Sequence, residues 1–379
     1  MYWIALRMLT GDRNKYLALV FGVAFATLLM TNQVSIFMGI ITRTGNQILE
    51  VRDADIWVMD NRVRFLDEAP PLQDTDLLRV RGVAGVAWAV RHYKGTVQAR
   101  LEDGNARNVL LTGLDDESMA GAPPEMIVGN LADLKIPDAV IVDKPGYEWM
   151  WGEEPYKLGR TFQINDRRAV LVGVCKISSP FLSTPIAYTR YSQAARFAPQ
   201  GRNTMNYILV KAHDGVNHHE LCRRIEQRTG RSALTQTQFF WKTIRYFLSS
   251  TGIPVNFGIT IALGFIVGAA VTGQTLYLFI VENLKQFGAL KAMGIPNNGI
   301  LKMVLLQAVL VGGIGFGIGV GLCALFFIGT SNQTQLAGLH MTWVAFAGTG
   351  AAILVIVLAT SYFSARRVLV LEPAIVFRG

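Results

Sequence analysis

Charge is scarce in this sequence and absent from two long stretches of it. Only 17% of the 379 residues are Asp, Glu, Lys or Arg, while 51% are hydrophobic. Residues 246–281 and 303–365 contain no Asp, Glu, Lys or Arg at all. A membrane-spanning helix needs about 20 consecutive, predominantly apolar residues, and an ordinary soluble domain has about 25% charged residues. The scarcity of charge therefore excludes an ordinary soluble protein and predicts a membrane protein.

Motifs for nucleotide binding and hydrolysis are also missing. The sequence has no G-x-x-x-x-G-K-[ST] loop, so we expect no P-loop nucleotide site, and it has no H-E-x-x-H, C-x-x-C or G-x-S-x-G motif. His218, His219 and Cys222 have a metal-like spacing, but a zinc site needs three or four ligands, so we interpret them as a solvated helix start. We therefore expect no catalytic residue, metal or cofactor in this chain.

Cysteine is rare, with three in the whole chain. Cys323 falls in an apolar stretch, whereas Cys175 and Cys222 lie in the more polar part of the sequence. These two are candidates for a disulfide if their compartment is oxidising. Spacing alone does not establish a bridge, so two unpaired, buried cysteines remain the alternative.

Four apolar stretches, residues 16–42, 254–281, 303–329 and 341–363, are long enough to cross a membrane. The predicted fold is a membrane protein with four transmembrane α-helices and a large α+β extracytoplasmic domain inserted between helices 1 and 2. The expected segments are the N-terminus with helix 1 (1–42), the extracytoplasmic domain (43–250), helix 2 (251–281), a cytoplasmic coupling helix and turn (282–302), helix 3 (303–329), a short external loop (330–340), helix 4 (341–365) and a cytoplasmic tail (366–379).

Basic residues gather at one set of helix ends, which predicts the orientation because Lys and Arg in short loops mark the cytoplasmic side. The residues concerned are Arg7, Arg13, Lys15, Lys285, Lys291, Lys302, Arg366, Arg367 and Arg378. The loop at 330–340 has no Lys or Arg. We therefore expect both termini and residues 282–302 in the cytoplasm. We attribute the net charge of +9 to this topology and not to nucleic-acid binding.

Patterns within residues 43–250 predict a mixed α and β domain, or two smaller subdomains. Apolar or alternating runs predict strands at 55–60, 86–91, 95–101, 107–112, 161–164, 169–174 and 207–210. Asp103-Gly104 and residues 165–167 separate paired runs and predict hairpins. Helices are expected at 218–229 and 237–249, and we place the aromatic residues of the second helix in the membrane interface.

Between helices 2 and 3 a short polar island separates two apolar runs. Residues 281–293 predict a helix, since Leu284, Phe287 and Leu290 recur on one face. Gly294 is placed to end this helix in a left-handed conformation, and Pro296 to open the next one. Small residues in the spans predict close helix packing. They are Gly264, Gly268, Gly313, Gly317 and Gly321, with a second repeat at Gly315 and Gly319.

The island carries a specific resemblance. The segment IVENLKQFGALKAMGIPNNGILKMVLLQAVL, residues 280–310, resembles the region between membrane helices 2 and 3 of MacB/FtsX-type ABC transporter permeases, most of all the DevC branch. The matching positions are Glu282, Lys285, Gly288, Leu290, Lys291, Ala292 and Gly294. Gln286 stands where the family often has Glu. The tail ARRVLVLEPAIVFRG (365–379) and the strand ADIWVMD (54–60) also resemble the family.

The resemblance implies a homodimer in a bacterial inner membrane that works with a dimer of separate ATPase subunits, which bind ATP and Mg. It further implies an HlyD-like periplasmic adaptor and an outer-membrane channel. ATP hydrolysis in the partner is coupled to export or extraction of a lipid, lipoprotein or hydrophobic compound. The residues expected to couple to the ATPase are Glu282, Lys285, Gln286, Phe287, Gly288, Leu290, Lys291 and Gly294.

Two other functions remain open from the sequence. One is an FtsX-like signalling protein whose external domain activates a cell-wall hydrolase without transporting cargo. The size of residues 43–250 favours an exporter that contacts an adaptor. The other is an isolated channel or carrier, which needs no ATPase. The spans carry no ionisable Asp, Glu, Lys or Arg of the kind that ion-coupled carriers use, and this favours an energy source in a partner chain.

Overall fold

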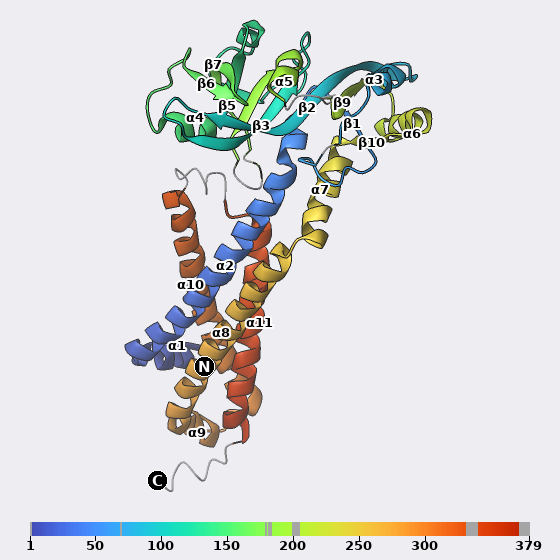
Figure 1. Cartoon of the computed structure of the whole chain (residues 1–379). Coiled ribbons are helices and arrows are strands. Elements are labelled where there is room, and N and C mark those ends of the chain that lie inside the picture. Colours follow the sequence, from blue (N-terminus) through green and yellow to red (C-terminus); the bar gives the residue numbers. More distant parts are fainter. Residues whose placement is uncertain are drawn as a thin grey trace. The chain divides into compact units, whose positions relative to one another are not determined.

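The chain divides into two compact units, which we describe separately. The computed structural model describes residues 2–68, 70–178, 180, 184–198, 205–330 and 340–370. The helical unit consists of residues 1–39 and 252–379, and the α+β unit of residues 40–251. Figure 1 labels most of the elements of both. Most of the expected loop at 330–340 and of the expected tail at 366–379 lies outside the described residues.

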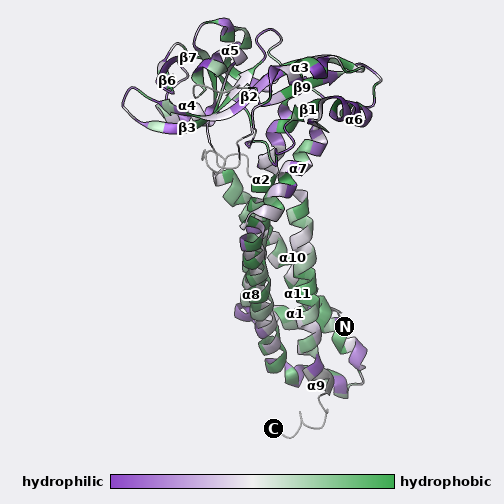
Figure 2. Ribbon diagram, turned by 45° about the vertical axis from the view of Figure 1, so that its right-hand side comes forward, coloured by the Kyte–Doolittle hydropathy of each residue, from purple (hydrophilic) through white to green (hydrophobic). Residues whose placement is uncertain are grey.

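Long apolar helices build the helical unit. Its elements are α1 (Tyr2–Gly11), α2 (Arg13–Glu50), α8 (Ile253–Glu282), α9 (Leu284–Ala292), α10 (Asn297–Thr330) and α11 (Trp343–Val370), of which α2 extends into the α+β unit. Four described helices, α2, α8, α10 and α11, are long and apolar enough to cross a membrane. Figure 2 shows their hydrophobic residues in green. The predicted four apolar helices, with an α+β domain between the first and the second, are confirmed.

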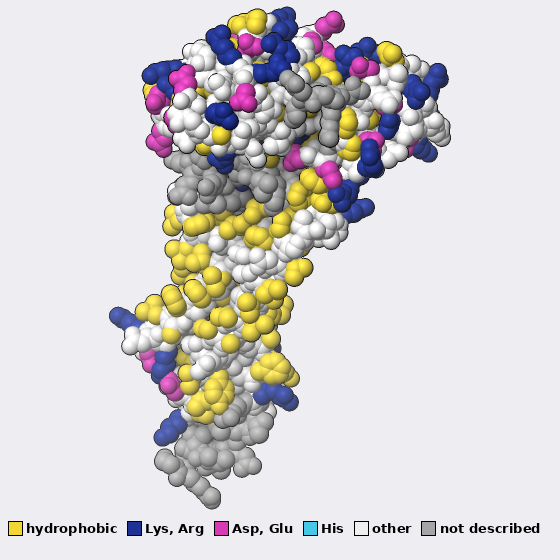
Figure 3. Space-filling view, in the orientation of Figure 1, with side chains coloured by type: hydrophobic (Ala, Val, Ile, Leu, Met, Phe, Trp, Pro, Cys, Tyr) yellow, Lys and Arg dark blue, Asp and Glu magenta, His cyan; other side chains and the backbone are white. Residues whose placement is uncertain are grey.

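Apolar side chains cover the outside of these helices as well as their shared core. Val23, Ile280, Val304 and Ile356 are buried in one cluster between the helices. Figure 3 shows many further hydrophobic side chains on the outer surface of the same helices. A soluble monomer rarely exposes an apolar surface of this extent, whereas lipid is a suitable neighbour for it. The helical unit is therefore suited to a lipid environment.

Helix α2 is longer than the expected span, which ended at residue 42. Its last three turns, from Ile40 to Glu50, lie in the α+β unit, where Gln47 donates to the carbonyl oxygen of Ser178 at 3.2 Å. Glu50 accepts from the backbone N–H of Ser178 at 3.1 Å, and the Lys94 ammonium donates to the Gln47 side chain. These partners satisfy polar groups that would otherwise be buried without a hydrogen bond. The helix therefore continues to Glu50.

The α+β unit is built on one mixed sheet of ten described strands. Its order is β10-β1-β9-β2-β3-β8-β5-β7-β4, and β6 pairs with β2 and β7. The strands are β1 (Ile56–Met59), β2 (Val86–Arg100), β3 (Ala106–Leu114), β4 (Glu125–Gly129), β5 (Ala139–Asp143), β6 (Thr161–Ile164), β7 (Arg167–Lys176), β8 (Ile186–Arg190), β9 (Tyr207–Ala212) and β10 (Ser232–Thr235). The helices are α3 (Asp74–Arg81), η1 (Leu131–Lys135), α4 (Lys144–Trp151), α5 (Tyr191–Phe197), α6 (His218–Thr229) and α7 (Gln236–Ser250).

The turn residues account for the two predicted hairpins. β2 and β3 pair antiparallel around Asp103-Gly104, and β6 and β7 pair antiparallel around Asn165-Asp166. Asn165 and Asp166 have φ values of 48° and 60°. A two-residue type I′ turn requires positive φ at both central residues, and Asn and Asp tolerate it. The runs at 86–91 and 95–101, expected as separate strands, are joined in β2, which pairs with β9 in its first half and with β3 in its second.

Strand β1 contributes the centre of an aromatic core. Trp57 is only 1% exposed and lies 5.2 Å from the ring of Tyr207 and 5.5 Å from that of His92, both in edge-to-face geometry. Phe239 of α7 completes the group, with ring centroids 5.7 Å apart from Trp57. Such aromatic pairs add about 0.5–1.5 kcal/mol each beyond the area that they bury. This core fixes the start of α7 to the sheet.

His92 makes the stability of the α+β unit depend on acid. Burial, with a contribution from nearby Lys94, lowers the pKa of His92 from 6.5 to about 3. Below pH 6.5 the unfolded chain binds a proton that folded His92 does not, so stability falls as the pH falls from 6.5 towards 3. At 1.36 kcal/mol per pH unit, the loss between pH 7 and pH 5 is about 2 kcal/mol.

Chemical unfolding of the wild type and of His92→Asn at pH 7 and pH 5 checks this expectation. The variant has a lower free energy of unfolding at both pH values. Because it has no side chain that titrates at position 92, its free energy of unfolding falls by about 2 kcal/mol less than that of the wild type between pH 7 and pH 5. Equal losses in the two proteins would show that His92 is not the acid-sensitive group.

The cysteines of the α+β unit are unpaired. Cys175 and Cys222 are both buried and free, and they belong to different hydrophobic clusters, the first beside Ile141 and Val172 and the second beside Leu221 and Ile225. Burial raises the pKa of the Cys222 thiol to about 12 and that of Cys175 further. Both side chains therefore serve as small apolar core residues, the alternative left open by the sequence.

Candidate functional site

The candidate site is the region around α9, where the polar island of the sequence lies. Helix α8 ends at Glu282, and Asn283 caps it by donating from its backbone N–H and its side-chain amide to the carbonyl oxygen of Phe279, at 3.2 and 2.7 Å. The same residue begins α9. The prediction of one helix over 281–293 is therefore wrong for its first residues, because Asn283 separates α8 from α9. Helix α9 is a separate helix of nine residues.

One face of α9 is anchored in the core of the helical unit. Phe287, Gly288 and Leu290 are buried, and Phe287 is among the largest fully buried side chains of the protein. Phe287 and Leu290 join a cluster that includes Ile300 and Met303 of α10. Helix α9 is therefore packed against the helices on both sides of it in the sequence, α8 and α10.

The opposite face of α9 is polar and open. Lys285, Gln286 and Ala289 are exposed, as are Ala292 and Gly294, and Met293 just beyond the helix is 72% exposed. Lys291 is half-buried. No described residue of this chain covers this face. Beside the polar Lys285 and Gln286, this face presents Met293, and methionine is enriched at protein–protein interfaces.

A tight turn fixes the end of α9 to the start of α10. Gly294 has φ +92° and donates from its backbone N–H to the carbonyl oxygen of Lys291 at 3.1 Å. The backbone N–H of Ile295 donates to the carbonyl oxygen of Leu290 at 3.2 Å. Glycine suits this position because a side chain disfavours the left-handed region. Pro296 directly precedes α10, and its carbonyl oxygen accepts from Gly299 at 2.8 Å. The predicted glycine termination is present.

An ion-pair network ties the end of α8 to the start of α2. The Lys15 ammonium contacts the carboxylate of Glu282 and lies 2.8 Å from a carboxylate oxygen of Asp12. A hydrogen bond from Lys15 lowers the pKa of Asp12. All three side chains are substantially exposed, and exposed pairs contribute little to stability. The network therefore connects Glu282, one of the residues expected at the site, to Lys15 near the start of α2.

Helix α1 is a component that the sequence analysis missed. Ala5 and Leu9, four residues apart, are buried in the same cluster as Phe287. The side-chain amide of Gln307 in α10 donates to the carbonyl oxygen of Ala5 at 2.7 Å. The i, i+4 spacing of the apolar residues Ala5 and Leu9 was the sequence signal for a helix here. Helix α1 is too short to cross a membrane, so a search for membrane spans does not find it. Gln307 therefore holds α1 against α10.

The predicted packing glycines fall into two groups. A methyl group at Gly268 would lie 2.6 Å from Cβ of Ala26, and one at Gly264 would lie 3.3 Å from Cγ of Met30, so α8 approaches α2 closely at both. Within the described chain, nothing lies within 4 Å of such a methyl group at Gly313, Gly317 or Gly321. The packing prediction for these three is therefore wrong for contacts within this chain.

The second glycine repeat of α10 makes the contact instead. A methyl group at Gly315 would lie 2.7 Å from Cβ of Val23, and one at Gly319 would lie 2.6 Å from Cβ of Thr27. Both repeats have a four-residue spacing and differ only by two positions, which places them on different sides of the helix. Only the tertiary structure identifies which repeat faces α2.

The residues with a metal-like spacing belong to the start of α6. The described residues contain no group of three or more His, Cys, Asp or Glu side chains that could hold a metal ion. His218 lies 3.9 Å from a carboxylate oxygen of Asp55, and Nδ1 of His219 lies 3.2 Å from the amide of Gln238. The side chain of Asn217 caps α6 by accepting from the backbone N–H of His219 at 2.9 Å. His218 and His219 therefore begin a capped helix.

Comparison with known proteins finds a family that matches the C-terminal part of the chain. Residues 258–373 match the FtsX-like permease C-terminal family. Uncharacterized ABC transporter permeases of Mycobacterium bovis and Mycobacterium tuberculosis are each 34% identical over 114 residues. The match covers 30% of this chain and 31% of each relative, so it spans less than a third of their length. None of these descriptions concerns the DevC branch, which stays a prediction.

Two solved structures resemble part of the chain. The extracellular domain of the noncanonic ABC-type transporter YknZ from Gram-positive bacteria is 16% identical, with 48% of this chain and 98% of that one covered at a TM-score of 0.36. The periplasmic region of MacB from Actinobacillus actinomycetemcomitans is 17% identical, with 53% and 94% covered at a TM-score of 0.37.

Proposed function

We propose that this chain, whose residues 258–373 form an FtsX-like permease C-terminal domain, is the membrane subunit of an ABC transporter. A separate ATPase subunit binds ATP and Mg and contacts the exposed face of α9. The observation that carries this proposal is the two-sided character of α9. Phe287 and Leu290 fix it to the helical core, while Lys285 and Gln286 remain open to a partner.

The anchoring of α9 supports a mechanical role. When the ATPase subunits close on ATP, a helix seated on them is displaced, and a rigidly packed helix transmits that displacement to its neighbours. The Asn283 cap links α9 to α8, and the Gly294 turn links it to α10. Only Thr251 and Gly252 separate α8 from α7 of the α+β unit. A displacement of α9 is thereby passed to α8, which continues through Thr251 and Gly252 into α7 of the α+β unit.

The composition of the spans supports an apolar or amphiphilic cargo. The spans expected at 254–281, 303–329 and 341–363 contain no Asp, Glu, Lys or Arg. A charge-free helical core offers no favourable path to a hydrophilic solute. We therefore place the cargo among lipids, lipoproteins or hydrophobic compounds, which enter from the membrane or from outside it. Transport of a small water-soluble solute from the cytosol by the reconstituted complex would contradict this.

The proposed assembly is a homodimer with two ATPase subunits in a bacterial inner membrane, with both termini in the cytoplasm. A periplasmic adaptor and an outer-membrane channel complete it. Gly313, Gly317 and Gly321 leave an open, small-residue face on α10, which suits close approach of a second helix.

Purification of the tagged chain from its own host, followed by mass spectrometry and an ATPase assay, tests the proposal. An ABC ATPase is expected at equal stoichiometry, and a preparation without one would contradict the proposal.

Labelling in spheroplasts checks the topology. We expect Arg223→Cys in the α+β unit to react with a membrane-impermeant maleimide, and Gln286→Cys in α9 to react only after the membrane is permeabilised. Both positions are exposed, and the native cysteines are buried, so the background is low. The unmodified chain is the control. Reaction of Gln286→Cys in intact spheroplasts would place α9 outside and exclude contact with a cytoplasmic ATPase.

A further inference from the structure

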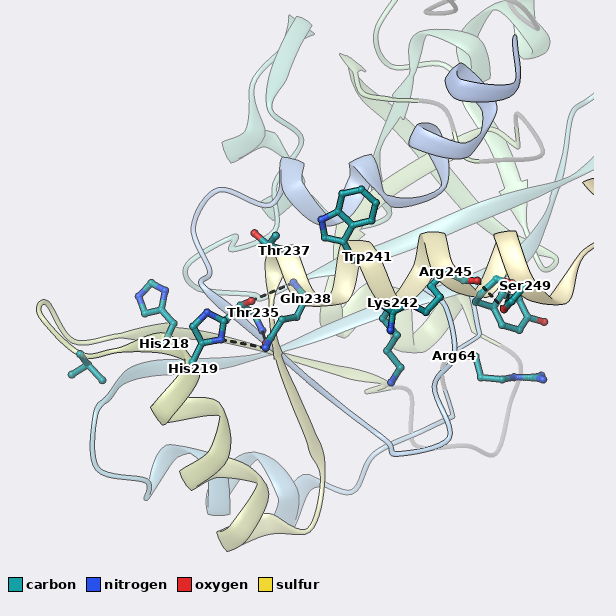
Figure 4. A pocket seen from close by; sticks show the side chains of 12 residues that line it. Arg64, His218, His219, Thr235, Thr237, Gln238, Trp241, Lys242, Arg245 and Ser249 are labelled. Atoms are coloured by element: carbon teal, nitrogen blue, oxygen red, sulfur yellow. Dashed lines mark hydrogen bonds between the residues drawn. The ribbon is translucent and has the colours of Figure 1, made fainter. Parts of the chain in front are cut away.

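A groove runs along one side of α7, within the α+β unit. Its volume is about 1010 Å³, and we call it the α7 groove. It is lined by Arg64, Val216, His218, His219, Thr235, Thr237, Gln238, Trp241, Lys242, Arg245, Tyr246 and Ser249. Figure 4 shows that Trp241, Lys242, Arg245 and Ser249 all come from α7, with Trp241 and Lys242 leaving the helix in different directions. The lining contains cations, hydroxyl groups and aromatic rings, but no carboxylate.

Two cations of the groove have no carboxylate partner. Among the described residues, no Asp or Glu lies within ion-pair distance of Lys242 or Arg245. By contrast, Arg64 is paired with Glu68, with nitrogen-to-oxygen distances of 2.6 and 2.8 Å. Lys242 is half-buried, and this burial lowers its pKa, although the negative charge of Glu226, which is beyond ion-pair distance, acts in the opposite direction and to a smaller extent. Removing an ammonium from water without a partner is unfavourable, and an anionic ligand would offset that cost. The groove is therefore complementary to an anion at Lys242 and Arg245.

Aromatic side chains supply an apolar wall in the same groove. Trp241 is 57% exposed, although it is one of the largest apolar side chains on α7. The Tyr246 ring is held in place by stacking on Phe65, with ring centroids 4.7 Å apart. Arg245 follows Trp241 by four residues in α7, a spacing that places two side chains on the same face of a helix. A flat, exposed indole beside this cation suits a ligand that has a charged end and an apolar end. A small inorganic anion would leave this wall unused.

We propose that the α7 groove binds the phosphate of an anionic amphiphile. Lys242 and Arg245 contact the phosphate oxygens, and Trp241 lies along the apolar part of the ligand. The guanidinium of Arg245 can donate two parallel hydrogen bonds to a phosphate, while Lys242 acts as a point charge. The shared chemistry is a phosphate group, which a lipid headgroup or a soluble phosphate ester supplies. The apolar wall favours the lipid.

Titration of the full-length chain in zwitterionic nanodiscs tests the site. The probes are dihexanoyl phosphatidylglycerol, dihexanoyl phosphatidylcholine and glycerol phosphate, and the readout is the change in fluorescence that Trp241→Phe removes. We expect saturable binding of phosphatidylglycerol, at least about tenfold tighter than either other probe, with an affinity that falls as salt is raised. Equal binding of the two lipids, or of glycerol phosphate and phosphatidylglycerol, would overturn the proposal.

Matched variants separate the groove from general surface charge. We expect Lys242→Gln combined with Arg245→Gln to weaken phosphatidylglycerol binding about tenfold or more, because two charge-assisted contacts are removed. The control is Arg223→Gln combined with Arg228→Gln, an equal loss of charge at exposed positions of α6 outside the groove, and it leaves binding unchanged. Equal effects of the two pairs would overturn the proposal. The measurement needs no ATPase, so its outcome is independent of the function proposed above.

Discussion

Lys285→Glu is expected to reduce the ATP hydrolysis of the purified complex, and the amount of ATPase that co-purifies, by about tenfold or more. Lys285 lies on the exposed face of α9, which we propose as the contact with the ATPase. Reversing a charge inside a protein interface leaves unpaired or like charges together, which costs about 2–5 kcal/mol, and 1.4 kcal/mol corresponds to a factor of ten. The fold should be unaffected, because the side chain is outside the helical core.

The matched control is Arg7→Glu, which makes the same change of charge on an exposed residue of α1. Its hydrolysis rate and its ATPase content should remain within about twofold of the wild type, since surface substitutions rarely matter away from an interface. Thermal unfolding of both variants checks that the helical unit is intact. An unchanged rate together with an unchanged complex for Lys285→Glu would exclude α9 as the coupling element, whatever the role of the rest of the chain.

Phe239→Ala is expected to destabilise the α+β unit by about 3–5 kcal/mol, the usual cost of removing a buried Phe side chain. Phe239 is fully buried between the rings of Trp57 and Tyr207, at centroid distances of 5.7 and 5.9 Å. It is the side chain that fixes the start of α7 to the sheet. Loss of this contact should lower the midpoint of thermal unfolding, followed by near-ultraviolet circular dichroism, by roughly 10 °C.

Leu248→Ala is the control for Phe239→Ala, because it also shortens an apolar side chain of α7. Leu248 is 41% exposed and lies outside the α7 groove, so we expect a loss below about 1 kcal/mol. A similar loss in both variants would mean that the aromatic core does not hold α7. If Phe239→Ala unfolds the α+β unit while the far-ultraviolet circular dichroism signal of the helical unit is retained, the two units unfold independently.

Phe239 also illustrates where the sequence was misleading. The aromatic residues of 237–249 were expected together in the membrane interface, but the structure distributes them among different environments. Phe239 belongs to the core of the α+β unit, Tyr246 and Phe247 pack on Phe65, and Trp241 is exposed in the groove. Composition identifies an aromatic helix, but only the packing of that helix decides which rings are buried.

Short buried strands were the main omission in the α+β unit. β5 (AVIVD) is buried at every position, and β8 (IAYTR) at every position but its last, so neither has the alternating pattern that identifies a strand with one solvated face. Their partners are also distant in the sequence, since β8 pairs with β3 and β5 pairs with β7. By contrast, α6 was predicted with the bounds observed, His218–Thr229, and in the structure Asn217 caps its start and Gly230 follows its end.

The sequence by itself determined the four apolar helices, the position of the inserted domain, its hairpins and the turn at Gly294. These features depend on local composition, on the length of an apolar run and on residues that tolerate positive φ, all of which act within a few residues. Only the tertiary structure decided that Asn283 separates α8 from α9, that α1 packs on α10, and that Gly315 and Gly319 face α2 in place of Gly313 and Gly317. It also brought Arg64, Lys242 and Trp241 into one groove. Contacts of this kind join residues far apart in the chain, and their energies depend on shape and burial, which no local pattern specifies.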